Sequence, residues 1–179
     1  MERNIALVAL FAALIAALGL VPQFALPFGV PITAQSMGVM LAGTILGARR
    51  GALAVLLFLF LVTLGLPLLS GGRGGPGVFA GPTAGFLFGF PVAAFVTGWL
   101  AERWRGGPAV VMPALAAMAG GVVVLYAFGI SGFAFVTSRS LAEAAGVMWV
   151  FVPGDVIKAA LTGVLTQAIL RARPGIAGA

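Results

Sequence analysis

The sequence contains no cysteine and no histidine, and only 8% of its 179 residues are charged. Without these two residue types the chain has no disulfides, no thiol chemistry and none of the usual soft or imidazole metal ligands. Hydrolases that depend on a Ser–His or Cys–His pair are excluded for the same reason. The scarcity of charge excludes an ordinary soluble domain, in which about a quarter of the residues are charged.

Long apolar runs make up most of the chain instead. Hydrophobic residues account for 61% of it, and the mean hydropathy is +1.18. Only helices or closed barrels satisfy the backbone inside a bilayer, and continuous apolar runs favour helices. We therefore predict an all-α membrane protein, a single integral membrane domain over residues 1–179, with six transmembrane helices at about 5–21, 32–48, 51–66, 82–100, 109–128 and 153–170. We expect a polar loop over 129–145 and a short helix over 141–151.

The basic residues are spread singly or in pairs between the apolar runs, although the net charge is +6. This distribution is typical of membrane-protein loops rather than of a phosphate-binding stripe, so we expect no nucleic-acid partner. Six helices put both termini on one side, together with seven of the nine arginines, and leave Arg73 and Arg139 on the other. The positive-inside rule then predicts cytoplasmic termini in a lipid-surrounded protein of the cell membrane.

The first predicted helix carries a row of small residues. Ala9, Ala13 and Ala17 are four residues apart, a spacing that makes a flat face for close approach by another helix. The alternative is that alanine is simply a common helix former. A secretory signal peptide starts similarly, but this apolar run is long and the rest of the chain is apolar too, so we expect a retained helix.

The stretch Val152-Pro153-Gly154-Asp155-Val156-Ile157-Lys158 holds the only lysine and one of the four acidic residues, in otherwise apolar surroundings. Ionisable groups at membrane depth are costly, which makes a functional site with a partner the default hypothesis. The alternative is that Asp155 and Lys158, three residues apart on one helical face, only neutralise each other. A lysine near a helix start also faces the positive end of the helix dipole, which an anionic ligand would offset.

Other polar residues gather at the same, outer ends of the predicted helices. Gln35 and Thr83 open two helices, Tyr126 lies near the end of a third, and Arg73 and Gly81 belong to the glycine-rich loop 67–81. Helix capping is the simpler role for a polar residue in a first turn, and a flexible linker is the simpler role for the loop. Glycines also let a backbone approach a ligand closely. The clustering at one membrane face predicts an outward-facing binding cavity.

Three stretches resemble the BioY family of biotin transporters. They are Ile32-Thr33-Ala34-Gln35-Ser36, the glycine-rich loop running through Gly81-Pro82-Thr83-Ala84-Gly85-Phe86-Leu87 to Gly89-Phe90-Pro91, and Val152–Lys158. The resemblance covers about residues 5–170, with Ala84 where a third small residue, often glycine, is expected. It implies the substrate-binding subunit (S component) of an energy-coupling-factor (ECF) transporter, which has six helices and captures a vitamin from outside.

The resemblance also implies partners. An S component associates with a transmembrane coupling subunit and two cytoplasmic ATPases, and the row Ala9, Ala13 and Ala17 corresponds to the docking face. The chain has no Gly-xxxx-Gly-Lys-Ser/Thr loop, so ATP hydrolysis is expected on the partner chains. No cofactor is expected in this chain.

For biotin, the resemblance makes Asp155 an acceptor for the ureido N–H groups. Lys158 could donate to the ureido carbonyl or pair with the valerate carboxylate, and Arg73 is the alternative partner for the valerate. Further predicted contacts are Gln35, Thr83, Gly81 and Tyr126, and the candidate walls for the bicyclic ring are Tyr126, Phe79 and Trp149. Each of these three aromatics is equally well explained as a core or lipid-interface residue.

Other functions stay open at this point. The chain could be an S component for another vitamin such as riboflavin or thiamine, or a biotin transporter that works without an energising module. A membrane enzyme acting on lipid is disfavoured by the shortage of acid–base pairs and the absence of histidine and cysteine. A purely structural helix bundle would need neither Asp155 nor Lys158.

Overall fold

The computed structural model describes residues 2–23 and 29–176, and every regular element within them is a helix. The elements are α1 (Glu2–Leu18), α2 (Gln35–Leu46), α3 (Ala48–Thr63), the 3₁₀ turn η1 (Pro76–Ala80), α4 (Ala84–Arg103), α5 (Val111–Met118), the π-helical turn η2 (Ala119–Val124), α6 (Leu125–Thr137), α7 (Leu141–Met148), the 3₁₀ turn η3 (Trp149–Phe151), α8 (Val152–Ala172) and the 3₁₀ turn η4 (Pro174–Ile176). The predicted all-α class is confirmed for the described residues.

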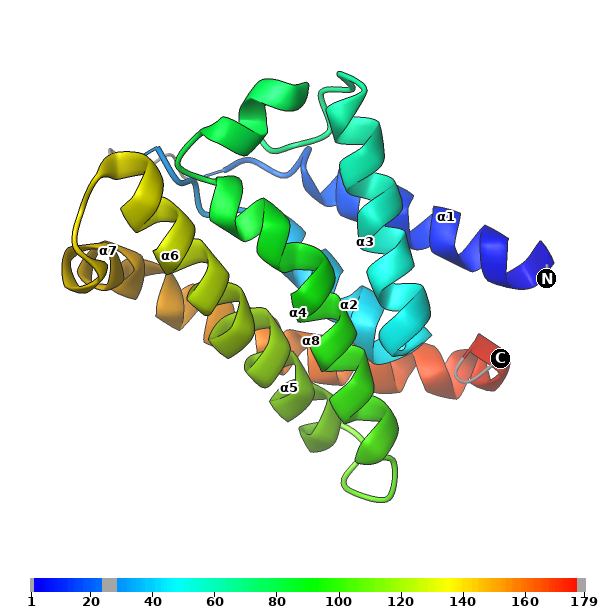
Figure 1. Cartoon of the computed structure of the whole chain (residues 1–179). Helices are drawn as coiled ribbons and strands as arrows, with labels where there is room; N and C mark the ends of the chain where they lie inside the picture. The colour runs from blue at the N-terminus through cyan, green and yellow to red at the C-terminus, as the bar shows by residue number, and fades with distance from the viewer. Residues whose placement is uncertain (1, 24–28, 177–179) are drawn as a thin grey trace.

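Helix α2 is the most enclosed element of the bundle. All of its residues except Met37 are buried, because α1, α3, α4 and α8 all pack around it. Helix α4 runs across the front of the bundle, with α3 on one side and α6 on the other (Figure 1). The start of α1 and the end of α8 lie on the same side of the molecule in this view.

Small residues allow α4 and α6 to pack backbone against backbone. A Cβ added at Gly85 of α4 would collide with the backbone of Phe128 and Gly132 in α6. One turn on, Gly89 packs against the side chain of Phe128. Gly85 and Gly89, four residues apart on α4, thus permit the close approach of the two helices. Such contacts matter in a membrane, where burial of apolar surface gives little drive for helix association.

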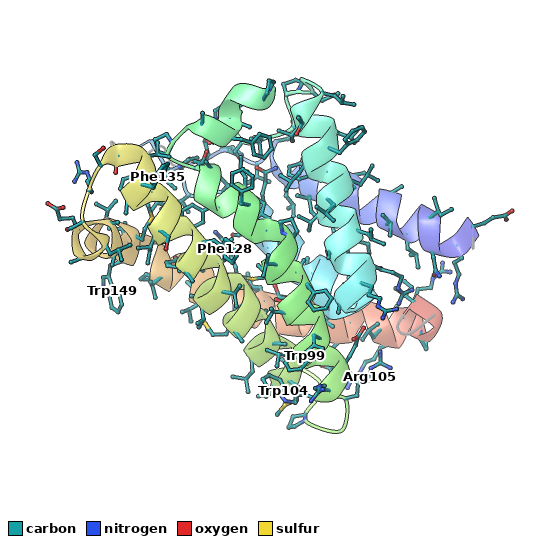
Figure 2. All side chains as sticks on the ribbon, viewed as in Figure 1. Trp99, Trp104, Arg105, Phe128, Phe135 and Trp149 are labelled. Atoms are coloured by element: carbon teal, nitrogen blue, oxygen red, sulfur yellow. The ribbon has the colours of Figure 1, made fainter. Side chains whose placement is uncertain are left out.

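The outer surface is apolar and suits a lipid environment. In the described part of the chain, three helical stretches are long and apolar enough to cross a membrane: Ala84–Arg103, Val111–Thr137 and Leu141–Ala172. Trp99 and Trp104 lie with Arg105 at the end of α4, whereas Trp149 lies near the start of α8 (Figure 2). Tryptophan at the ends of spanning helices is typical of membrane–water interfaces.

One predicted boundary is wrong. The helix expected over 109–128 continues as α5, η2 and α6 to Thr137, so most of the predicted loop 129–145 is helical. The hydroxyl of Thr137 donates to the carbonyl of Phe133 and fits within the helix, which ends at Ser138 in a left-handed conformation. A capping box of Ser140 and Glu143 then starts α7, in agreement with the short helix expected there. The other predicted helix ends differ by three residues or fewer from those observed.

Candidate ligand-binding site

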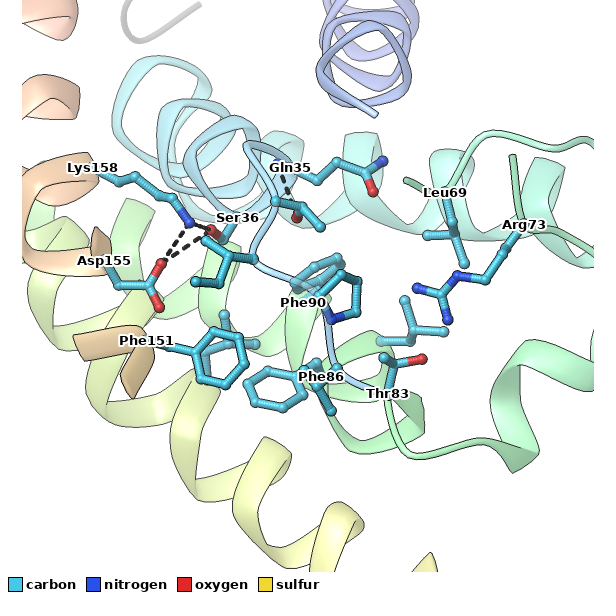
Figure 3. A pocket seen from close by; sticks show the side chains of 16 residues that line it. Gln35, Ser36, Leu69, Arg73, Thr83, Phe86, Phe90, Phe151, Asp155 and Lys158 are labelled. Carbon is cyan, nitrogen blue, oxygen red and sulfur yellow. Dashed lines mark hydrogen bonds and ion pairs between the residues drawn. The ribbon is translucent and has the colours of Figure 1, made fainter. Parts of the chain in front are cut away.

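A pocket lies between the starts of α2, α4 and α8, residues 30–33, and the segment that comes after α3 (Figure 3). The space between its walls, including its open mouth, is about 630 Å³. Five residues selected from the sequence line it: Gln35, Arg73, Thr83, Asp155 and Lys158. The fold thus gathers side chains that are up to 123 positions apart, counted from 35 to 158.

One end of the pocket holds a polar group that we call the Asp155 cluster: Ser36, Tyr126, Asp155 and Lys158. Lys158 Nζ lies 2.8 Å from Asp155 Oδ1 and donates to Ser36 Oγ at 3.1 Å. The Ser36 hydroxyl is 3.4 Å from the same carboxylate oxygen, and the Tyr126 hydroxyl donates to Asp155 Oδ2 at 2.6 Å. Each oxygen of this buried carboxylate therefore has a donor, which offsets the loss of its water.

The first turns of α8 explain how Asp155 and Lys158 come to share the pocket. Pro153 occupies the first turn, where its missing N–H costs nothing. Residues three apart lie on the same helix face, and α8 turns this face toward the start of α2, where Ser36 lies.

Tyr126 reaches the cluster from just beyond a π-helical turn. A π turn carries one residue more than an α turn and therefore rotates the next part of the helix around its axis; such turns are frequent at functional sites. Leu125 and Tyr126 are the first two residues after η2. Leu125 lines the pocket, whereas Tyr126 lies outside the lining and acts on it through Asp155.

The opposite end of the pocket holds Arg73 and Thr83 (Figure 3). Arg73 Nε donates to the carbonyl of Ser70 at 3.3 Å, and no carboxylate among residues 2–23 and 29–176 pairs with its guanidinium. Figure 3 shows the guanidinium pointing into the pocket. A guanidinium with free N–H groups is well suited to a carboxylate ligand.

Apolar side chains separate the two polar ends. Phe86 and Phe90 of α4 and Phe151 of η3 form much of this wall, and the ring of Phe86 meets that of Tyr126 edge to face at 6.2 Å. Sequence reasoning missed these three phenylalanines and gave Ser36 no ligand role. The four-residue spacing of Phe86 and Phe90 behind Thr83 was a usable signal, because it puts them on one helix face.

Besides Tyr126, three predicted site residues lie outside the pocket lining. Trp149 is 73% exposed and points away from the molecule (Figure 2). Phe79 packs against Phe88, with ring centroids 5.6 Å apart, at an apolar groove between α4 and α6. Gly81 belongs to the turn before α4. Gln35 does line the pocket, but its amide is hydrogen-bonded to the main chain.

The profile of the BioY family matches residues 2–175, nearly the whole chain. This chain belongs to the BioY family. Among BioY relatives, the biotin transporter BioY of Rhodobacter capsulatus is 52% identical over 97% of this chain and 96% of its own length. The biotin transporter BioY of Rhizobium etli is 54% identical over 96% of this chain and 95% of its own.

A solved crystal structure agrees with the fold. It is described as the S-component for biotin from an ECF-type ABC transporter and matches with a TM-score of 0.90 at 31% identity, covering 95% of this chain and 92% of the other. The resemblance read from three short stretches is therefore confirmed over almost the entire chain.

Proposed function

We propose that this BioY-family chain captures biotin in the pocket and carries it across the cell membrane as the S component of an ECF-type transporter. The observation that supports this most directly is the division of the pocket into two polar ends and an aromatic middle. Biotin has the same sequence of chemistry: a ureido group, an apolar bicycle with a short chain, and a carboxylate. The names of the relatives agree with this ligand.

The two polar ends of the pocket differ in charge pairing, and this difference gives the ligand's orientation in this proposal. The Asp155 cluster offers carboxylate acceptors next to an ammonium donor, which suits the two N–H groups and the carbonyl of the ureido ring. Lys158 already shares its charge with Asp155, whereas the guanidinium of Arg73 has no acidic partner among the described residues. We therefore place the valerate carboxylate at Arg73 and the ureido group at Asp155 and Lys158.

The proposal includes six membrane crossings, by α1, α2, α3, α4, the continuous α5–α6 and α8, with both termini in the cytoplasm. In support, the start of α1 and the end of α8 lie on the same side of the molecule (Figure 1). Helices α1 and α3, with 17 and 16 residues, are about 25 Å long, a little less than a hydrocarbon core. The shorter α2 is surrounded by protein.

Because the chain contains no cysteine, this topology can be tested with single introduced cysteines. A membrane-impermeant maleimide should label Ser138→Cys, in the connection after α6, on intact cells. It should label Arg171→Cys, near the end of α8, only after permeabilisation. Labelling of both from outside would contradict the assignment.

Ala9, Ala13 and Ala17 are the proposed docking face for the coupling subunit, and ATP would be hydrolysed by the partner ATPases. All three are exposed, while Ala12 and Ile15 on the other side of α1 are buried against the bundle. Close helix–helix contact requires a row of small side chains that are not already packed against other helices. Uptake of biotin by proteoliposomes containing this chain alone would instead support transport without an energising module.

The central experiment is equilibrium binding of labelled biotin to the detergent-purified protein. We expect saturable, tight binding that unlabelled biotin competes and riboflavin or thiamine do not. No binding by well-folded protein would contradict the proposal, and competition by another vitamin would redirect it.

The orientation is tested by pairing Arg73→Gln with biotin methyl ester, which lacks the negative charge. We expect the variant to bind biotin at least about tenfold more weakly, because a charge-assisted hydrogen bond is lost, and to discriminate little between acid and ester. Arg139→Gln is the matched control, since Arg139 is exposed and outside the pocket. A variant that still prefers the acid as strongly as the wild type would move the carboxylate to Lys158.

A further inference from the structure

The side-chain amide of Gln35 joins three separate segments of the chain. Its Nε2 donates to the carbonyl of Ile15 in α1 at 3.2 Å and to that of Leu68 at 3.0 Å. Its Oε1 accepts from the backbone N–H of Ser70 at 3.0 Å. Both N–H groups of the amide are thus used by the main chain, which leaves none for a ligand.

Residues 69–73 form a small hairpin with little freedom of its own. Leu69 and Arg73 exchange backbone hydrogen bonds of 3.0 and 3.2 Å, and the side chain of Arg73 bonds the carbonyl of Ser70. Gly71 and Gly72 close the turn with φ of +79° and +68°, values that glycine adopts without strain. The hairpin can therefore move as a unit.

This hairpin is part of the wall of the pocket. Leu69 and Arg73 both line it, and Leu69 is 3% exposed. The hydroxyl of Ser70 is buried and has no partner among the described residues. The polar attachment of the hairpin to α2 consequently depends on the two bonds from Gln35.

The third bond of the amide ties the same junction to α1. The end of α1 is packed tightly there, since a Cβ added at Gly19 would lie 2.5 Å from the carbonyl oxygen of Leu68 and 2.9 Å from Gln35 Nε2. A displacement of α1 relative to α2 would therefore strain the amide and, through it, the hairpin. The opposite face of α1 carries the exposed Ala9, Ala13 and Ala17.

We propose that Gln35 is a positioning residue: it latches the 69–73 hairpin over the pocket and links this latch to α1. Ligand binding and release both require the hairpin to move away, which breaks the bonds to Leu68 and Ser70. Engagement of α1 by a partner would loosen the same bonds and favour release. This inference rests on the proposed function for its ligand, but the latch itself can be tested without one.

The test measures association and dissociation rates of radiolabelled biotin for the wild type and Gln35→Met, which keeps the side-chain length and removes the hydrogen bonds. We expect both rates to rise by about tenfold, because the closed position of the hairpin loses the net free energy of about one buried hydrogen bond. The change in Kd should be smaller. A direct ligand contact would raise only the dissociation rate. That result, or unchanged rates, would overturn the latch.

Gln167→Met is the matched control, because Gln167 is a partly buried residue of α8 outside the pocket lining. Hydrogen exchange of the Ser70 amide supplies a readout that needs neither biotin nor a folded variant. In the wild type this amide should be as protected as those of α2, and fast exchange would contradict the latch. The wild type could fail to bind biotin while its Ser70 amide is protected from exchange and that of Gln35→Met exchanges fast. This result would reject biotin as the ligand and retain the latch.

Discussion

The interface between α2 and α8 contains a charged contact and a neutral one, and the two differ in character. Near the start of α2, Ser36 meets Asp155 and Lys158. Two turns further on, the hydroxyls of Thr44 and Thr166 lie 2.7 Å apart. Between them the hydroxyl of Thr162 lies 3.8 Å from the sulfur of Met40. The contacts recur at 36, 40 and 44 against 158, 162 and 166, the four-residue spacing of one helix face.

The two contacts differ in what they leave unused. The threonine pair is neutral and buried: one hydroxyl donates to the other, and Thr44 has the carbonyl of Leu41 as a further acceptor. In the Asp155 cluster, Lys158 bonds Asp155 and Ser36, and both ionic side chains line the pocket, with a third ammonium N–H available to a ligand. A polar group within a membrane protein thus indicates a binding site when its charged side chains line a cavity. It indicates helix–helix association when its hydrogen bonds are all made within the protein.

Asp155→Asn, in the charged contact, should cause the largest loss of biotin affinity. It removes the negative charge that holds Lys158 and that, in the proposed orientation, would accept from the ureido group, so we expect biotin affinity to fall by about a hundredfold or more. Equilibrium binding with purified protein measures this, and thermal unfolding in the same detergent shows whether the bundle persists. Unchanged affinity in a folded variant would reduce Asp155 and Lys158 to a structural ion pair.

Tyr126→Phe should have an intermediate effect. The variant keeps the ring contact with Phe86 and loses only the 2.6 Å donor to Asp155. Because Tyr126 acts through Asp155 rather than on the ligand, we expect biotin to bind about tenfold more weakly. The same binding assay checks this. A loss as large as that of Asp155→Asn would mean that the hydroxyl touches the ligand, and no loss would make Tyr126 a core residue only.

The parts of this protein that obey local rules could be predicted from its sequence. Apolar runs located the helices, and the rarity of charge singled out Asp155 and Lys158. The lengths of α5 and α6 could not be predicted, because Ser131 and Thr137 look like loop residues until a helix supplies a carbonyl for the threonine hydroxyl. The division of the pocket also depends on tertiary packing, which brings Phe86, Phe90 and Phe151 together.

Individual residues illustrate the same limit for function. Gln35 was predicted to contact the ligand, but the fold shows that its amide bonds to the main chain of two other segments. Trp149 was a reasonable aromatic wall by its position before Asp155, yet it lies on the outer face of the helix and is 73% exposed. A sequence gives the chemistry of a side chain, whereas its direction depends on the groups that pack around it.

The smallest effect is expected from Thr44→Val and Thr166→Val. Valine keeps the shape of threonine, so each single variant should lower the free energy of unfolding by about 0.6 kcal/mol, the average for polar helix contacts in membranes, and by no more than about 1.7 kcal/mol. The double variant should cost less than the sum, because it leaves no hydroxyl without its partner. Thr44 also has the carbonyl of Leu41 at 3.3 Å as a second acceptor, which keeps the cost of Thr166→Val at the lower end. Biotin affinity should be unchanged in all three variants. A clear loss of affinity in the folded double variant would show that the whole α2–α8 interface, and not its charged end alone, belongs to the binding unit.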